Sequence, residues 1–298
     1  MKRPISRRTF LRNGGLALAA LPFAATAQAP KAGGGWRVGC FTRPWGQHEY
    51  RVALDAIAEA GFKDAGLMTA KSDNGLIISV KSTVEEAQKI GEECKKRGLK
   101  VPSLYGGDIP VAESLQAGID GLKRLIDCSL AAGVENLMMG GVTDKALHEP
   151  YYKAIAECCP YAAEKGLGLS VKPHGGSNST GPECRKILEF VGKKNFGLWY
   201  DPGNIFYYSD GALDPVDDAA TVNGLVVGMS VKDFLPPKEV MLTPGSGKVE
   251  FPKVMAKLKQ GGFTSGPLLI ECLSQGDLPH LLAEARKAKQ FVEQLIAA

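Results

Sequence analysis

Charged side chains follow several apolar runs in the second half of the chain, and their types suit proton-transfer chemistry. Lys172 and His174 stand in Val-Lys-Pro-His-Gly-Gly, Asp201 begins Asp-Pro-Gly-Asn, and Glu271 ends Leu-Leu-Ile-Glu. Carboxylates and imidazole accept and return protons, whereas an ammonium group stabilises the oxyanion that forms when a proton leaves the carbon next to a carbonyl. The candidate catalytic residues are therefore Glu271, Lys172, His174 and Asp201.

A second group of polar and aromatic residues offers contacts to a substrate. Guanidinium, ammonium, amide and hydroxyl groups hydrogen-bond sugar hydroxyls, and an indole stacks on the apolar face of a pyranose. The candidates are Arg43, Trp45, Asn204, Ser230 and Lys232. Structural alternatives stay open: Trp45 would be a packed indole and Asn204 a turn cap. Lys232 would then form an internal ion pair with Asp233.

The elements that must position these residues alternate between strand-like and helix-like patterns. The predicted strands are 37–41, 64–68, 101–105, 136–139, 167–171, 196–200, 226–231 and 267–271. The predicted helices are 50–60, 84–97, 114–132, 149–165, 181–191, 214–222, 251–260 and 278–296. Eight such pairs with short returns predict parallel strands and an α/β fold, the single-domain (β/α)8 TIM barrel. An open doubly wound sheet is the alternative, but the Gly-rich phosphate loop typical of it is missing.

In a TIM barrel the reactive residues lie at the carboxyl ends of the strands. Because side chains alternate along a strand, an inward Asp201 places Trp199 inward as well. The same count predicts that four strand-end residues face one another across the barrel mouth, namely Lys172, Asp201, Ser230 and Glu271.

Four segments resemble one known family over nearly the whole chain that follows residue 35. They are Gly-Leu-Gly-Leu-Ser-Val-Lys-Pro-His-Gly-Gly, Leu-Trp-Tyr-Asp-Pro-Gly-Asn, Gly-Met-Ser-Val-Lys-Asp and Gly-Pro-Leu-Leu-Ile-Glu-Cys. These are similar to strands five to eight of the xylose isomerase-like barrels of sugar phosphate isomerases and epimerases. The resemblance implies carbohydrate chemistry by proton abstraction next to a carbonyl, and a divalent metal held by Glu, Asp, His and Glu. Here Lys172 replaces the first Glu and Ser230 the His.

Two arrangements of the site follow from this departure. In the first, the Lys172 ammonium lies between Asp201 and Glu271 in place of an ion, because two facing carboxylates need positive charge between them. In the second, one divalent Mg, Mn or Zn ion is held by Asp201, Glu271 and His174. The ligand chemistry favours the metal-free arrangement, and both stay open.

The amino-terminal segment resembles an export signal. Ser6-Arg7-Arg8-Thr9-Phe10-Leu11 precedes a short apolar run and small-residue cleavage options after Ala27 or Ala29, a pattern typical of the twin-arginine route. We therefore expect a signal at 1–29, a linker at 30–35, a barrel at 36–298 and a periplasmic or otherwise exported location.

The charge balance limits the partners. The chain carries a net charge of +4, yet five basic residues and no acid lie in 1–29, so the remainder has a net charge of −1. Such a chain lacks the basic field that nucleic acid or anionic membranes attract, which leaves a small carbohydrate as the expected partner. The near-neutral charge also argues against a phosphodiesterase-type endonuclease. The function expected is a sugar isomerase or epimerase. The alternative is a non-catalytic periplasmic barrel that binds carbohydrate.

Overall fold

A computed structural model describes residues 35–297. The predicted export signal and all but the last residue of the predicted linker lie outside these residues, so export stays a prediction. Within 35–297, no helix combines the length and the apolar composition that a membrane span requires.

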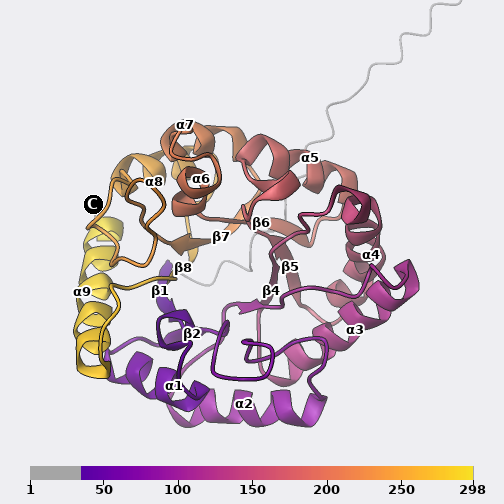
Figure 1. Ribbon diagram of the computed structural model, residues 1–298, viewed down its shortest axis with the longest axis horizontal. Helices are drawn as coiled ribbons and strands as arrows, with labels where there is room; N and C mark the ends of the chain where they lie inside the picture. Colours follow the sequence, from indigo (N-terminus) through magenta and orange to yellow (C-terminus); the bar gives the residue numbers. More distant parts are fainter. Residues whose placement is uncertain (1–34, 298) are drawn as a thin grey trace, which may run out of the picture.

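Eight strands form the centre of the molecule and helices surround them in a ring (Figure 1). The strands are β1 (Trp36–Phe41), β2 (Asp64–Gly66), β3 (Leu104–Tyr105), β4 (Asn136–Met139), β5 (Gly168–Val171), β6 (Phe196–Tyr200), β7 (Val226–Val231) and β8 (Gly266–Ile270). The α-helices are α1 (Tyr50–Glu59), α2 (Val84–Lys96), α3 (Leu115–Ala131), α4 (Lys145–Glu164), α5 (Gly181–Val191), α6 (Pro202–Tyr208), α7 (Pro215–Ala219), α8 (Phe251–Gln260) and α9 (Leu278–Ala297). Three 3-10 helices complete the elements: η1 (Arg43–Trp45), η2 (Gly176–Asn178) and η3 (Ala220–Val222).

The sheet confirms the predicted (β/α)8 barrel. Its strands are all parallel and follow the order β2-β1-β8-β7-β6-β5-β4-β3. Single bridges between β2 and β3, such as Leu67 with Leu104, join the two ends of that order. The amide of Tyr105 donates to the Leu67 carbonyl at 2.8 Å. The ends of all eight strands therefore converge on one mouth, as the site prediction requires.

One additional helix and two altered helices distinguish the structure from the prediction. Residues 202–208 were expected to be a loop but form α6, because Asp201 caps the helix and Pro202 has the backbone angle that a first helical residue needs. Helix α4 begins at Lys145, where the Asp144 carboxylate caps it, and not at Glu149. The predicted helix 214–222 divides into α7 and η3.

The core consists of two groups of buried side chains. The larger group lies between the sheet and the surrounding helices. The smaller group contains inward-facing strand residues, namely Phe41, Met68, Met138, Trp199 and Leu269. All seven cysteines are buried and unpaired within the described residues, where they pack as small apolar core residues.

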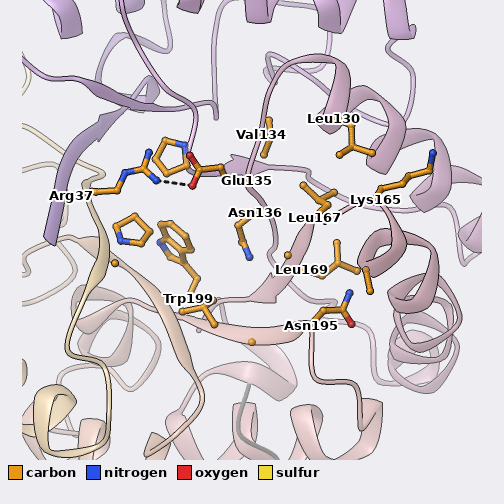
Figure 2. A pocket seen from close by; sticks show the side chains of 18 of the residues that line it. Arg37, Leu130, Val134, Glu135, Asn136, Lys165, Leu167, Leu169, Asn195 and Trp199 are labelled. Carbon is orange, nitrogen blue, oxygen red and sulfur yellow. Dashed lines mark hydrogen bonds and ion pairs between the residues drawn. The ribbon is translucent and has the colours of Figure 1, made fainter. Parts of the chain in front are cut away.

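A cavity of about 790 Å3 opens at the amino-terminal end of the barrel, opposite the predicted site. Its lining includes the start of β5, β6 and β8, with Trp199 reaching it from the barrel interior (Figure 2). Beside it, Arg37 Nη1 lies 2.6 Å from Glu135 Oε2, and Arg37 also pairs with Asp64. This end therefore carries an ion-pair group of its own.

Candidate active site

The ends of β5, β6 and β8 bring the predicted lysine and the two carboxylates together. Lys172, Asp201 and Glu271 each follow the last residue of their strand directly, and all three are buried. The Lys172 ammonium Nζ lies 2.8 Å from Asp201 Oδ2 and 2.6 Å from Glu271 Oε2. The structure thus contains the carboxylate, ammonium, carboxylate bridge that the metal-free arrangement predicted.

A second ammonium group joins this bridge. Lys232 Nζ lies 3.1 Å from Asp201 Oδ2 and 2.7 Å from Glu271 Oε1, and it donates to Asn204 Oδ1 at 2.9 Å. The predicted Lys232–Asp233 ion pair is wrong. The Asp233 carboxylate instead accepts four backbone N–H groups of the following loop, those of Phe234, Gly245, Gly247 and Val249. Consecutive residues leave a strand on opposite sides, which separates these two side chains.

Arg43 completes the group at the end of β1. It is the first residue of η1, whose Pro44 favours the tight turn, and its Nη1 lies 2.6 Å from Glu271 Oε1. The guanidinium side chain is 31% exposed, whereas that of Glu271 is 1% exposed. Arg43 is therefore the cation of this group that solvent reaches most easily. We call Arg43, Lys172, Asp201, Lys232 and Glu271 the charge cluster.

The positive and negative groups of the charge cluster stabilise one another's ionised forms. Burial opposes ionisation of Glu271, but the nearby charges of Lys172, Lys232 and Arg43 hold its pKa well below the ordinary value. Burial also opposes the charged form of Lys232, yet Asp201 and Glu271 raise the pKa of that ammonium above its ordinary value. At neutral pH Glu271 is therefore an anion and Lys232 a cation.

His174 lies beside the cluster in a different state. Burial, with the positive charges of Lys172 and Lys232, lowers its pKa from 6.5 to about 4, so the imidazole is neutral at pH 7. The rings of Tyr105 and Tyr208 flank it, with centroids 6.0 and 5.7 Å from the imidazole centroid. A neutral imidazole between two aromatic rings is a group that can accept a proton.

Two glycines leave room for the rings of Tyr105, His174 and Tyr208, which we call the aromatic wall. A Cβ at Gly140 would lie 2.5 Å from the Tyr105 hydroxyl oxygen and 3.3 Å from His174 Nδ1. Gly175 has a φ of +88°, and a Cβ there would lie 2.7 Å from the Tyr208 ring. The glycines after β4 and β5 therefore serve the close approach of these side chains.

The side chains of Asn204 and Ser230 both form hydrogen bonds with other residues of the protein. Asn204 Nδ2 donates to the Pro173 carbonyl at 2.6 Å, so this amide links Lys232 to the β5 end. Ser230 Oγ accepts a hydrogen bond from Trp199 Nε1 at 3.2 Å, which confirms that both side chains face the barrel interior. Their contact with a substrate stays a prediction.

Trp45 is not placed to stack on a sugar. Its side chain is 1% exposed and belongs to the larger core group between the sheet and the helices. Trp45 is the last residue of η1, two positions after Arg43. The packed alternative describes Trp45 correctly.

The divalent metal that the resemblance implies does not fit this set of donors. Within residues 35–297, no group of three or more His, Cys, Asp or Glu side chains is arranged to hold an ion. The proposed set of His174, Asp201 and Glu271 is therefore not assembled as a metal site. Two ammonium groups contact the oxygens of both carboxylates, and an ammonium cannot ligate a cation.

The sequence contained signals for some of the contacts that were missed, namely the place of Lys232 in the charge cluster and that of Tyr208 beside His174. Lys232 lies two positions beyond inward-facing Ser230, so the alternation that placed Ser230 also places Lys232 inward. Tyr208 lies on α6, and the Asp-Pro pair at 201–202 is a typical helix start. Tyr105 ends β3, but nothing in its spacing indicated a place beside His174.

The fold and the site define a (β/α)8 barrel with a buried charge cluster at its mouth. The chain belongs to the family of xylose isomerase-like TIM barrels, whose model matches residues 54–295.

The individual relatives have low sequence identity to this chain or align with only part of it. The chain is 30% identical over 115 residues to a probable L-ribulose-5-phosphate 3-epimerase of Mycoplasma pneumoniae, an alignment that covers 37% of this chain and 36% of that relative. It is also similar to the solved structure of a xylose isomerase domain protein from Planctomyces limnophilus. The TM-score is 0.63 at 18% identity, covering 89% of this chain and 97% of the other. A D-allulose 3-epimerase from Methylomonas sp., solved with D-allulose, gives a TM-score of 0.65 at 17% identity, with coverage of 87% and 97%. These two structures support the fold.

Proposed function

We propose that the protein is a sugar isomerase or epimerase that removes and returns the proton next to the carbonyl of a keto sugar, without a resident metal. The single observation that carries this proposal is the buried charge cluster beside a neutral imidazole. Family membership and the epimerase names of several relatives support the reaction class.

The cations of the cluster supply the electrophile. When a proton leaves the carbon next to a carbonyl, negative charge develops on the carbonyl oxygen, and fixed donors in a site that excludes water stabilise that charge. Lys172 and Arg43 are the donors suited to this role. Lys232 directs its three N–H groups to Asp201, Glu271 and Asn204, and so it positions the other members of the cluster.

The proton moves through His174. Its neutral imidazole accepts the proton from the carbon. The enolate then takes a proton from solvent on the opposite face, after which the imidazolium releases its own proton to solvent, or it takes the proton back from the imidazolium on the neighbouring carbon. The first outcome is epimerisation and the second is isomerisation. Glu271 is not free to accept a proton because three cations contact its two carboxylate oxygens. Together with Asp201 it holds Lys172 in place.

Proton exchange in D2O tests this function. The purified protein is incubated with D-fructose, D-allulose, L-ribulose and a 3-keto glucoside, and NMR follows replacement of the proton next to each carbonyl. We expect exchange with at least one of these sugars and a fall of about 100-fold or more in the His174→Gln variant, which is the usual contribution of a general base. Lys194→Gln, which changes an exposed residue at the opposite end, should exchange at the wild-type rate.

Two results would contradict the proposal. One is binding of a sugar without any deuterium uptake, which would identify a carbohydrate-binding barrel. The other is full exchange by the His174→Gln variant. Circular dichroism and thermal unfolding of each variant separate a lost proton acceptor from a lost fold.

A further inference from the structure

The charge cluster contains more positive than negative groups. Three cations, Arg43, Lys172 and Lys232, contact only two carboxylates. His174 is neutral. The Asp233 carboxylate is not part of the group, because it accepts four backbone N–H groups of the loop after β7 and forms no ion pair with these cations among residues 35–297. The group therefore carries a net charge of +1 at the bottom of the mouth, where burial weakens screening by solvent.

Arg43 has hydrogen-bonding capacity that the protein does not use. A guanidinium has five N–H donors in a planar fork, and among residues 35–297 only the Nη1 contact with Glu271 occupies the fork. Lys172 has three N–H groups and contacts two carboxylate oxygens within the same residues, so one donor is spare. These spare donors belong to the cluster's most exposed cation and to the ammonium beside His174.

We propose that the substrate carries a carboxylate and that Arg43 binds it, with the remaining N–H group of Lys172 turned to the reacting oxygen. This inference rests on the proposed function, since it names the substrate class of the same site. Arginine forks match the planar geometry of a carboxylate. The substrate class is therefore an oxidised sugar, a keto sugar acid or uronate.

The size of the excess charge favours a carboxylate over a phosphate. A carboxylate carries one negative charge and balances the net charge of +1. A phosphate monoester carries about −1.5 to −2 at pH 7 and would leave an uncompensated negative charge in a buried site. Neutral sugars would leave the excess positive charge unbalanced.

Calorimetric titration of the full chain tests the inference with matched ligands. The probes are D-glucuronate, D-glucose and D-glucose 6-phosphate, with D-galacturonate and D-galactose as a second pair. We expect each uronate to bind about tenfold or more tightly than its neutral parent, the size that a charge-assisted hydrogen bond gives, and more tightly than the phosphate. Arg43→Gln should abolish this preference and Arg43→Lys should retain part of it. Arg37→Gln, at the opposite end of the barrel, should leave it unchanged.

Several outcomes would overturn the inference. Equal binding of uronate and parent sugar, tighter binding of the phosphate, or a preference that survives Arg43→Gln would each do so. Failure of this inference can be distinguished from failure of the proposed function. If neutral keto sugars exchange deuterium but uronates are not preferred, the proposed function stands and this inference fails. If uronates are preferred but no sugar exchanges a proton, this inference about binding stands and the proposed function fails.

Discussion

The two ends of the barrel each hold an arginine beside carboxylates, yet the settings differ. At the amino-terminal end Arg37 is 27% exposed and its partner Glu135 is 46% exposed. At the mouth, Arg43 is similarly exposed but Glu271 is 1% exposed and also contacts two buried lysines. An exposed ion pair contributes little to stability, whereas removal of one member of a buried group leaves uncompensated charge. The comparison indicates that burial, and not the presence of an ion pair, distinguishes the mouth from the opposite end.

Neutralising one glutamate at each end should give the largest contrast. Glu271→Gln leaves three cations, two of them buried, with one carboxylate. We expect the free energy of unfolding to fall by about 3–5 kcal/mol and deuterium exchange to be lost. Glu135→Gln removes an exposed partner and should cost less than about 1 kcal/mol with exchange unchanged. Urea unfolding measures both values. Similar losses of unfolding free energy in the two variants, or full deuterium exchange by Glu271→Gln, would refute the difference between the two ends.

The same contrast explains which parts of the site the sequence predicted. Each strand-end residue is fixed by local periodicity, so Lys172, Asp201 and Glu271 were placed correctly relative to one another. Lys232 was expected to contact the substrate or, as the alternative, to pair with Asp233. The side chains of Lys232 and Asp233 instead leave the strand on opposite sides and find partners far apart in the sequence. Pairing across strands depends on the closed barrel, which no local pattern contains.

The fold was predicted more completely than the site for a related reason. Alternation of strands and helices, with glycine at helix ends, is repeated along the chain and tolerates errors of a few residues at each boundary. The aromatic wall is not repeated. Tyr208 reaches His174 only because Asp201 and Pro202 start an additional helix. Trp45 lies in a short 3-10 helix that no periodic pattern indicates, and its side chain is buried in the larger core group.

A change of ligands at the mouth should convert the cluster into a metal site. Lys172→Glu combined with Ser230→His removes one ammonium and adds two donor groups beside Asp201 and Glu271. We expect this variant to bind Mn2+ or Zn2+, with stabilisation of about 2.7 kcal/mol when the free ion is 100-fold above its dissociation constant. The wild-type chain should gain no stability. Thermal unfolding across a metal titration measures the effect.

The amino-terminal end provides the control for this conversion. Lys194→Glu adds a carboxylate near the cavity of Figure 2, where no such cluster surrounds it, and should produce no metal-dependent stabilisation. One ion per wild-type chain that resists dialysis would refute the metal-free proposal, because two ammonium groups and a bound cation cannot share the same two carboxylates.

The mouth should also contribute to the dependence of stability on pH. The pKa of His174 is about 4 in the folded protein against 6.5 for an ordinary histidine, so between these values the unfolded chain binds more protons. The contribution of His174 to stability is therefore fully present above pH 6.5 and is lost as the pH falls towards 4. Glu271, whose pKa is lowered, contributes stability that is present above pH 4.5 and is lost below it.

Activity and stability should separate along this pH range. The imidazole stays neutral down to about pH 4, so proton exchange should persist at pH 5 while the free energy of unfolding is already falling. His174→Gln should remove the slope of stability between pH 6.5 and 4, whereas Glu135→Gln should leave it unchanged because no histidine lines the amino-terminal cavity in the part of the chain that the structure describes. Exchange that declines with a midpoint near pH 6.5 would mean that the imidazole is hydrated and titrates normally. In that case the charges of Lys172 and Lys232 would not control the pKa of His174. The two ends of the barrel would then differ in which residues they contain, but not in how they shift a pKa.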